Sequence, residues 1–182
     1  HGTAEITLSV SDGMLTAEES FSLIVRNVYK ISGQVNYYSN DIPIPGVLVS
    51  LEAEDGSFSA EAVTDGNGTY TLSGIPPGAD YISAFSKAER PDPAIISAED
   101  ASKIARSVVG DLEISEYQRA AADVNRNGRV TSVDASDLSR YRVGLIPEMN
   151  EGGDSWTFLP ESASYPNLIS DVKDQEIAAM VL

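Results

Sequence analysis

The chain has 182 residues, enough for one large or two small domains with hydrophobic cores. Its formal net charge of −16, from 28 acidic and 12 basic side chains, argues against binding to nucleic acids or to anionic membrane surfaces. The chain has no cysteine and a single histidine at position 1, which removes most nucleophilic and acid–base constellations. No apolar run approaches the roughly 18 to 20 residues of a membrane span. We therefore expect a protein that is not an enzyme.

Residues 1–28 are expected to form two strands joined by a turn. Apolar and polar residues alternate over 4–10 and again over 20–28, and Ser11-Asp12-Gly13 supplies the turn. An isolated hairpin is only marginally stable in water, so these strands need a further sheet. The segment resembles the last two strands of tandem bacterial immunoglobulin-like or cadherin-like repeats. This implies an incomplete Ig-like domain, either excised from a longer secreted protein or completed by strand exchange.

Residues 29–86 show one short strand pattern after another, separated by Pro, Gly, Asn and Asp. This regular spacing is typical of a small β-sandwich. The expected strands span 30–38, 46–53, 58–64, 69–73 and 80–85. The side chains expected in the core are Val47, Val49, Tyr70, Leu72, Tyr81 and Phe85.

The same segment resembles the carboxypeptidase regulatory-like and collagen-adhesin B-type fold. The resemblance rests on four stretches of sequence: Ile31-Ser-Gly33-Gln-Val35, Pro43-Ile-Pro45-Gly46-Val47-Leu-Val49, Thr64-Asp65-Gly-Asn67-Gly68-Thr-Tyr70 and Ile75-Pro-Pro-Gly78-Ala-Asp-Tyr81. It implies an immunoglobulin-like sandwich with a structural role.

Residues 87–146 change to a helical period and contain an internal repeat. The segments 100–110 and 134–144 share Asp, Ala, Ser, Arg, Val and Gly at an offset of 34 residues (100 to 134). Each is preceded by a capping pattern, Ser97-x-x-Asp100 or Thr131-x-x-Asp134, and ends in glycine, which predicts two helices of about three turns. A further short helix is expected over 115–122.

The segment 123–134 has the spacing of a calcium-binding loop. Side-chain oxygens fall at positions 1, 3, 5, 9 and 12, glycine stands at position 6, and position 7 offers its backbone carbonyl. Asp/Asn/Gly runs also form ordinary turns, and Asp134 is also suited to capping a helix. Only two of the predicted ligands are carboxylates, which favours a weak, extracellular type of site. The predicted ligands are Asp123, Asn125, Asn127, Arg129, Thr131 and Asp134.

The duplicated loop–helix pattern of 87–146 resembles the dockerin-type F-hand, in which each repeat binds one Ca²⁺ and the helices dock onto a cohesin. The resemblance places the residues just named on the ligand positions of the second loop. The first loop departs from the family pattern, because prolines occupy its positions 3 and 5. Either this site has lost its metal, or a shortened loop uses Asp92, Ser97 and Asp100. The resemblance therefore implies one Ca²⁺ ion, with a second left open.

The remaining segment, 147–182, is expected to be an aromatic tail followed by a terminal strand over 177–182. Trp156, Phe158 and Tyr165 are expected to anchor the tail on the helices or the sandwich. The order of sandwich, duplicated helices and aromatic tail resembles an architecture of large bacterial secreted proteins. The expected fold is thus mainly β with an α-helical calcium-binding module: an immunoglobulin-like β-sandwich, a dockerin-like repeat and the hairpin of an incomplete Ig-like domain.

Three functions are compatible with these features. The first is a calcium-stabilised structural module of an extracellular or cell-surface bacterial protein, which forms filaments with copies of itself by strand complementation. The second is a dockerin-like module that binds a cohesin-type partner through the matched positions Lys103/Asp137 and Ser107/Tyr141. The third is a carbohydrate-binding sandwich. Its aromatic platform would comprise Tyr37, Tyr38 and Trp156.

Overall fold

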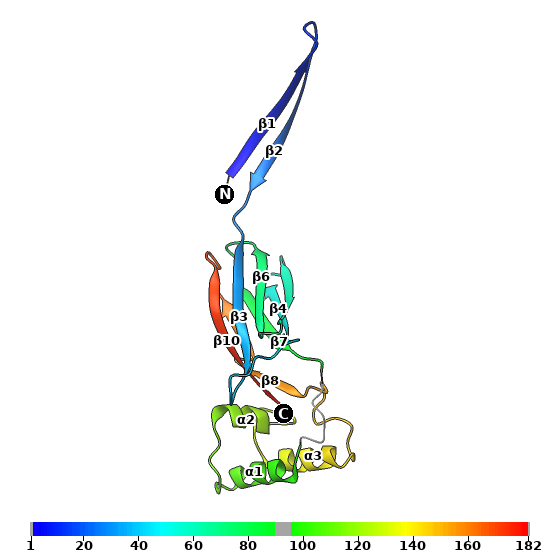
Figure 1. Ribbon diagram of the computed structural model, residues 1–182, viewed down its shortest axis with the longest axis vertical. Helices are drawn as coiled ribbons and strands as arrows, with labels where there is room; N and C mark the ends of the chain where they lie inside the picture. The colour runs from blue at the N-terminus through cyan, green and yellow to red at the C-terminus, as the bar shows by residue number, and fades with distance from the viewer. Residues whose placement is uncertain (1, 90–95, 182) are drawn as a thin grey trace.

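The computed structural model describes residues 2–89 and 96–181. Figure 1 shows three parts along the long axis: a β-hairpin, a β-sandwich and a layer of helices. The expected mainly β fold with a helical module is confirmed. The strands are β1 (Gly2–Ser11), β2 (Thr16–Val25), β3 (Tyr29–Tyr37), β4 (Leu48–Ala53), β5 (Ser59–Val63), β6 (Thr69–Ile75), β7 (Tyr81–Ser86), β8 (Trp156–Leu159), β9 (Ser162–Tyr165) and β10 (Val172–Val181). The helices are α1 (Ala98–Val108), α2 (Glu116–Ala122) and α3 (Ser132–Arg142).

The sandwich consists of two four-stranded sheets, with the strand orders β6-β3-β10-β8 and β5-β4-β7-β9. Alternate residues of each strand point inward, as the period of two predicts, and together they form one buried apolar core. Five of the six predicted core residues are buried, and the sixth, Phe85, packs against the core while partly exposed.

The C-terminal tail is an integral part of this sandwich. It supplies three of the eight strands, so the sandwich extends beyond the segment 29–86. β10 lies between β3 and β8, parallel to β3 and antiparallel to β8, and it begins at Val172, five residues before the expected terminal strand. The predicted anchors Phe158 and Tyr165 are buried in the core, and Trp156 is partly buried against it.

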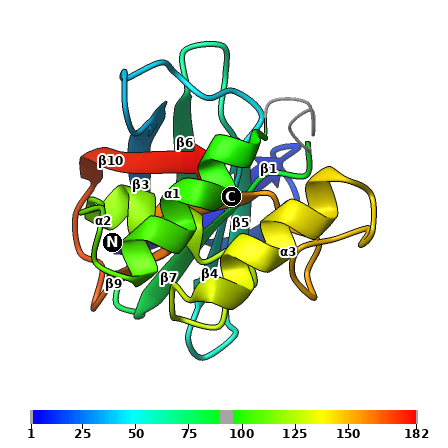
Figure 2. The ribbon, with the colours of Figure 1, turned by 90° about the horizontal axis from the view of Figure 1, so that it is seen from below.

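The helices occupy the connection between β7 and β8 and cover one end of the sandwich. Seen from below, α1 and α3 lie side by side across this end (Figure 2). Both begin with the predicted capping box, and their equivalent residues Ile104 and Leu138 are buried in a second, smaller apolar core. Within the stretches that the structure describes, no helix has the length and apolar character to cross a bilayer.

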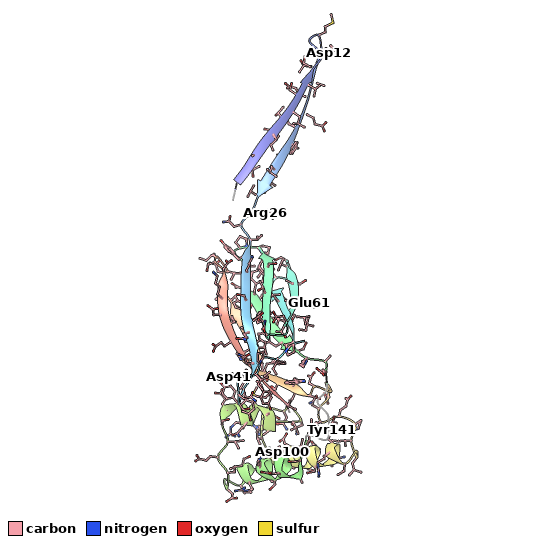
Figure 3. All side chains as sticks on the ribbon, in the orientation of Figure 1. Asp12, Arg26, Asp41, Glu61, Asp100 and Tyr141 are labelled. Carbon is pink, nitrogen blue, oxygen red and sulfur yellow. The ribbon has the colours of Figure 1, made fainter. Side chains whose placement is uncertain are left out.

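The hairpin of β1 and β2 projects from the opposite end of the sandwich, with Asp12 at its tip and Arg26 at its base (Figure 3). Residues directly opposite in the two strands share a face, and the pairs Ala4↔Leu23 and Ile6↔Phe21 make one face apolar. Apart from the half-buried Ile6, the side chains of both strands are exposed. The hairpin therefore presents an uncovered apolar face.

Candidate metal centre

The predicted calcium loop connects α2 to α3. Asp123 follows the last residue of α2, and Thr131 is the N-cap of α3. Gly128 and Arg126 have positive φ values, 82° and 57°, which wind the loop tightly. Glycine adopts this backbone conformation without steric cost, whereas a residue with a Cβ pays roughly 1–2 kcal/mol.

The side chains at positions 1, 3 and 5 fold over the backbone of this loop. The carboxylate of Asp123 accepts hydrogen bonds from the amides of Asn127, at 3.1 Å, and Gly128, at 2.7 Å. The amide oxygen of Asn125 accepts from Asn127 N at 3.2 Å, and that of Asn127 accepts from Arg129 N at 2.9 Å. Oxygens of three predicted ligand side chains thus converge on one short stretch of backbone.

Asp134 closes the loop from the first turn of α3. Its carboxylate is fully buried and accepts hydrogen bonds from Thr131 N at 2.8 Å, Thr131 Oγ1 at 3.0 Å and Asn125 N at 3.3 Å. Among residues 2–89 and 96–181, no lysine or arginine lies within ion-pair distance of it. These hydrogen bonds satisfy the carboxylate oxygens but leave the buried charge without an ion-pair partner among the described residues, and a bound cation would stabilise it.

The remaining two predicted ligands contribute less directly. Thr131 Oγ1 donates to Asp134 and accepts from Val133 N at 3.2 Å, so this hydroxyl serves the helix cap. In calcium loops position 9 often acts through a water molecule. The side chain of Arg129 is exposed, which leaves its backbone carbonyl as the ligand group expected at position 7.

The donor set suits a hard cation that prefers oxygen. It comprises two carboxylates, two side-chain amides, a hydroxyl and a backbone carbonyl, and Ca²⁺ takes six to eight such ligands. In the described part of the chain no three His, Cys, Asp or Glu side chains gather in a group that would hold a metal. Neutral oxygens therefore make up most of the set, consistent with a Kd of about 10⁻⁴–10⁻³ M.

The first repeat has the same helix-capping hydrogen bonds as the second, but its capping aspartate has a lysine nearby. Asp100 accepts from Ser97 N at 2.9 Å and from Ser97 Oγ at 2.8 Å, as Asp134 does from Thr131. The ammonium group of Lys103 lies 3.7 Å from the other oxygen of Asp100. Partial burial acts to raise the pKa of Asp100, but the Ser97 hydrogen bonds and Lys103 lower it overall. Asp92, the third residue of this predicted site, lies outside the described residues.

Lys103, predicted from the sequence only as a docking position, also affects the charge balance of the first repeat. It provides the positive charge in the first repeat, and its counterpart 34 residues later is Asp137. Asp137 forms an ion pair with Arg140 at 3.3 Å. The change from lysine to aspartate between two otherwise similar segments is visible in the sequence. It could have indicated that only the first repeat has a positive side chain near its capping aspartate.

The predicted aromatic platform is divided between two places. Trp156 Nε1 donates to the carbonyl of Glu89 at 2.7 Å, and Lys87 Nζ lies 5.7 Å from the centre of its ring. Tyr38 instead contacts Tyr37 and stacks on Tyr117, with ring centroids 5.2 Å and 5.8 Å apart. These contacts give Trp156 a packing role at the start of β8.

Comparisons with known proteins support the division into a β-sandwich and a dockerin-like helical module. The family model of the carboxypeptidase regulatory-like domain matches residues 30–93, and that of the dockerin type I domain matches residues 94–141. Both domain types are non-catalytic, and dockerin type I domains generally bind calcium. A search of curated proteins found no match.

Two solved structures match parts of this chain. BcpA, the major pilin subunit of Bacillus cereus, is 17% identical over 50% of this chain and 29% of its own, with a TM-score of 0.34. The dioxygenase domain of a dioxygenase carbohydrate-binding protein fusion from Streptomyces sp. SirexAA-E is 20% identical over 35% of this chain and 51% of its own, with a TM-score of 0.29. The chain thus spans less than a third of the pilin subunit and about half of the dioxygenase domain. Along the chain, a match to the carboxypeptidase regulatory-like domain is thus followed directly by a match to the dockerin type I domain.

Proposed function

We propose that this chain is a calcium-stabilised structural and protein-binding module of an extracellular or cell-surface protein, with one Ca²⁺ ion in the 123–134 loop. The fully buried carboxylate of Asp134, which lacks a basic partner among the described residues, carries this proposal. The dockerin type I match supports both the metal and an extracellular setting. The ion would hold the ends of α2 and α3 together, and its chemistry is charge neutralisation rather than catalysis.

One ion per chain is the expected stoichiometry. In the first repeat the ammonium group of Lys103 lies 3.2 Å from Glu99 and 3.7 Å from Asp100, so Asp100 already has a positive charge beside it, and Ser97 is committed to the helix cap. Isothermal titration of calcium into the metal-free chain should therefore give close to one site. Lys103→Ala is expected to leave that number unchanged, because prolines at positions 3 and 5 of the first loop supply no side-chain oxygen even when the lysine is removed. Two equal sites in the unmodified chain would contradict the single-ion proposal.

The second part of the proposal concerns filament assembly by the hairpin. The apolar face of β1 and β2, which includes Leu8, Val10, Phe21 and Leu23 at 47–72% exposure, is suited to packing on another sheet. Both strands also have an outer edge free to form backbone hydrogen bonds. We assign the completing sheet to a second copy of the chain, which makes the contact a strand complementation between subunits.

Leu23→Glu is expected to prevent this self-association without changing the stability of the sandwich by more than about 0.5 kcal/mol. The charge would fall on the apolar face of the hairpin, far from the sandwich core. Ile24→Glu is the matched control, because one step along a strand moves a side chain to the opposite face, where position 24 pairs with the uncharged Thr3. Light scattering and electron microscopy of the full chain measure the result. An unmodified chain that stays monomeric at high concentration would overturn the assembly proposal.

A cohesin-type receptor is the second candidate partner, favoured by the dockerin match and by one exposed pair. Val109 and Val143 stand 34 residues apart at the ends of α1 and α3 and are 77% and 63% exposed. The pairs predicted from the sequence are less alike: Lys103 and Asp137 differ in charge, and Tyr141 packs against the helical core.

Val109→Glu together with Val143→Glu is expected to weaken capture by a cohesin-type receptor at least tenfold, since the two exposed valines would no longer pack on it. Val63→Glu, at a 60% exposed position on β5, is the control and should bind normally. Surface plasmon resonance with calcium present measures the affinity. Equal binding by both variants would remove this pair from the interface.

A further inference from the structure

The 123–134 loop is connected to the sandwich by the side chain of Arg126. Its guanidinium forms an ion pair with Asp154 at 2.8 Å and donates to the carbonyl of Trp156 at 3.3 Å. Trp156 is the first residue of β8, so these two contacts run from the predicted metal loop to a strand of the sandwich. Arg126 stands at loop position 4 with φ 57°, and this backbone conformation directs where its side chain leaves the loop.

Asn150 forms a second connection beside the first. Its Nδ2 donates to the carbonyl of Val124 at 3.1 Å and to that of Asp154 at 2.8 Å. Its Oδ1 accepts from Asp154 N at 2.9 Å. Because Val124 is fully buried, Asn150 joins the interior end of the loop to the segment that carries the acidic partner of Arg126.

Trp156 also contacts the segment that follows β7. Its indole donates to Glu89 O at 2.7 Å, and Lys87 Nζ lies 5.7 Å from the ring centre. The side chain of Lys87 is 8% exposed, and its ammonium donates to the carbonyl of Pro45 at 2.9 Å. The indole therefore ties the start of β8 to the end of β7, where the chain leaves and re-enters the sandwich.

Elsewhere the helices meet the sandwich less closely. A half-open pocket of about 460 Å³ lies between them, lined by Tyr37, Tyr38 and Val181 from the sandwich end and by Lys103 and Gln118 among the helical residues. Across this pocket the two parts lack the dispersion contacts of a close-packed core. The orientation of the helices on the sandwich then depends on the stacking of Tyr38 on Tyr117 and on the polar contacts of Arg126 and Asn150.

We infer that calcium in the 123–134 loop is coupled to the sandwich through Arg126, which acts as the positioning residue of a calcium-dependent joint. The inference rests on the proposed calcium site. Without the ion, the carboxylates of Asp123 and Asp134 have no cation between them, and the loop opens by charge repulsion. Arg126 then leaves Asp154 and Trp156, and the helices lose their fixed orientation. With the ion, the loop geometry returns Arg126 to both acceptors.

Trp156 is the single tryptophan of the chain and lies at the joint, so it reports on the joint directly. Calcium added to the full, metal-free chain should change its fluorescence and slow amide exchange over 156–159. At a calcium concentration ten times Kd, linkage allows roughly a tenfold slowing. In Arg126→Ala and Asp154→Ala, both responses should be lost, while titration calorimetry still detects calcium and helical ellipticity still gains thermal stability.

Arg119→Ala is the control, because it removes the same charge from α2, directly before the loop, at a residue outside the predicted ligand set. The Arg119 side chain is exposed and has no ion pair among the described residues, so both responses should persist. If calcium binds the unmodified chain but leaves Trp156 and the 156–159 amides unchanged, the joint is refuted and the calcium site stands. If calorimetry detects no calcium, the proposed function itself fails. Full responses in Arg126→Ala would also refute the joint.

Discussion

Asp134→Ala is expected to destabilise the helical module by about 3 kcal/mol or more in 10 mM calcium. The substitution removes a fully buried carboxylate and leaves the donors on Thr131 and Asn125 without their acceptor. A buried donor without a partner costs about 1–3 kcal/mol. Loss of a site with a Kd of about 10⁻⁴ M removes about 2.7 kcal/mol more at this calcium concentration. Thermal unfolding followed by helical ellipticity, with calcium and with chelator, measures both parts.

Two substitutions separate the cap from the metal site. Asp134→Asn keeps a hydrogen-bond acceptor for Thr131 but loses the negative charge, so it should retain most stability in chelator and lose the calcium response. Asp100→Asn makes the same change in the first repeat, where Lys103 supplies the positive charge, and its calcium response should stay normal. A calcium response that survives in Asp134→Asn would show that the segment 123–134 is only a turn.

Gly33→Ala is expected to destabilise the sandwich by about 3 kcal/mol, at the upper end of the usual cost of overpacking. Gly33 lies in β3, paired with Gln175 of β10 on one side and Tyr70 of β6 on the other. A Cβ at this position would lie 2.7 Å from Gln175 Cβ and 2.9 Å from Tyr70 Oη, and it would also meet the Gln175 carbonyl. The strands would have to separate. Chemical denaturation followed by near-ultraviolet circular dichroism measures the loss.

Gly66→Ala is the control for this experiment, because a Cβ there meets no atom within 4 Å. It should change stability by no more than about 0.5 kcal/mol. Equal stability of Gly33→Ala and Gly66→Ala would mean that β10 does not pair with β3 in solution. The comparison thus tests the feature of the fold that departs most from a sandwich confined to 29–86.

The calcium loop and the helix caps were predictable because their signals are local. The spacing of Asp123, Asn125 and Asn127 determines which oxygens can meet inside one turn of backbone. The capping boxes at Ser97 and Thr131 involve only residues three positions apart, and both are present in the structure. Sequence spacing and spatial distance are nearly the same over such short stretches. The ligand set itself stays a prediction until calcium binding is measured.

The difference in charge balance between the two repeats could be predicted only in part from the sequence. The change from Lys103 to Asp137 is visible in the sequence, but its meaning depends on burial. Asp134 is fully buried, whereas the side chain of Asp100 is 43% exposed and lies near Lys103. Burial is a property of everything packed around a residue, so periodicity within one helix cannot supply it.

By itself the sequence determined the local elements of this protein: the hairpin, the strand pattern of 29–86, the duplicated capped helices and the spacing of the 123–134 loop. Only the tertiary structure decided that β10 enters the sandwich beside β3, that the helices occupy the connection between β7 and β8, and that Arg126 reaches Asp154. The physical reason is range. Strand and helix periods arise from neighbours along the chain. Arg126 and Asp154 are 28 positions apart, and the paired residues of β3 and β10 are more than a hundred apart, distances over which many pairings satisfy the same pattern.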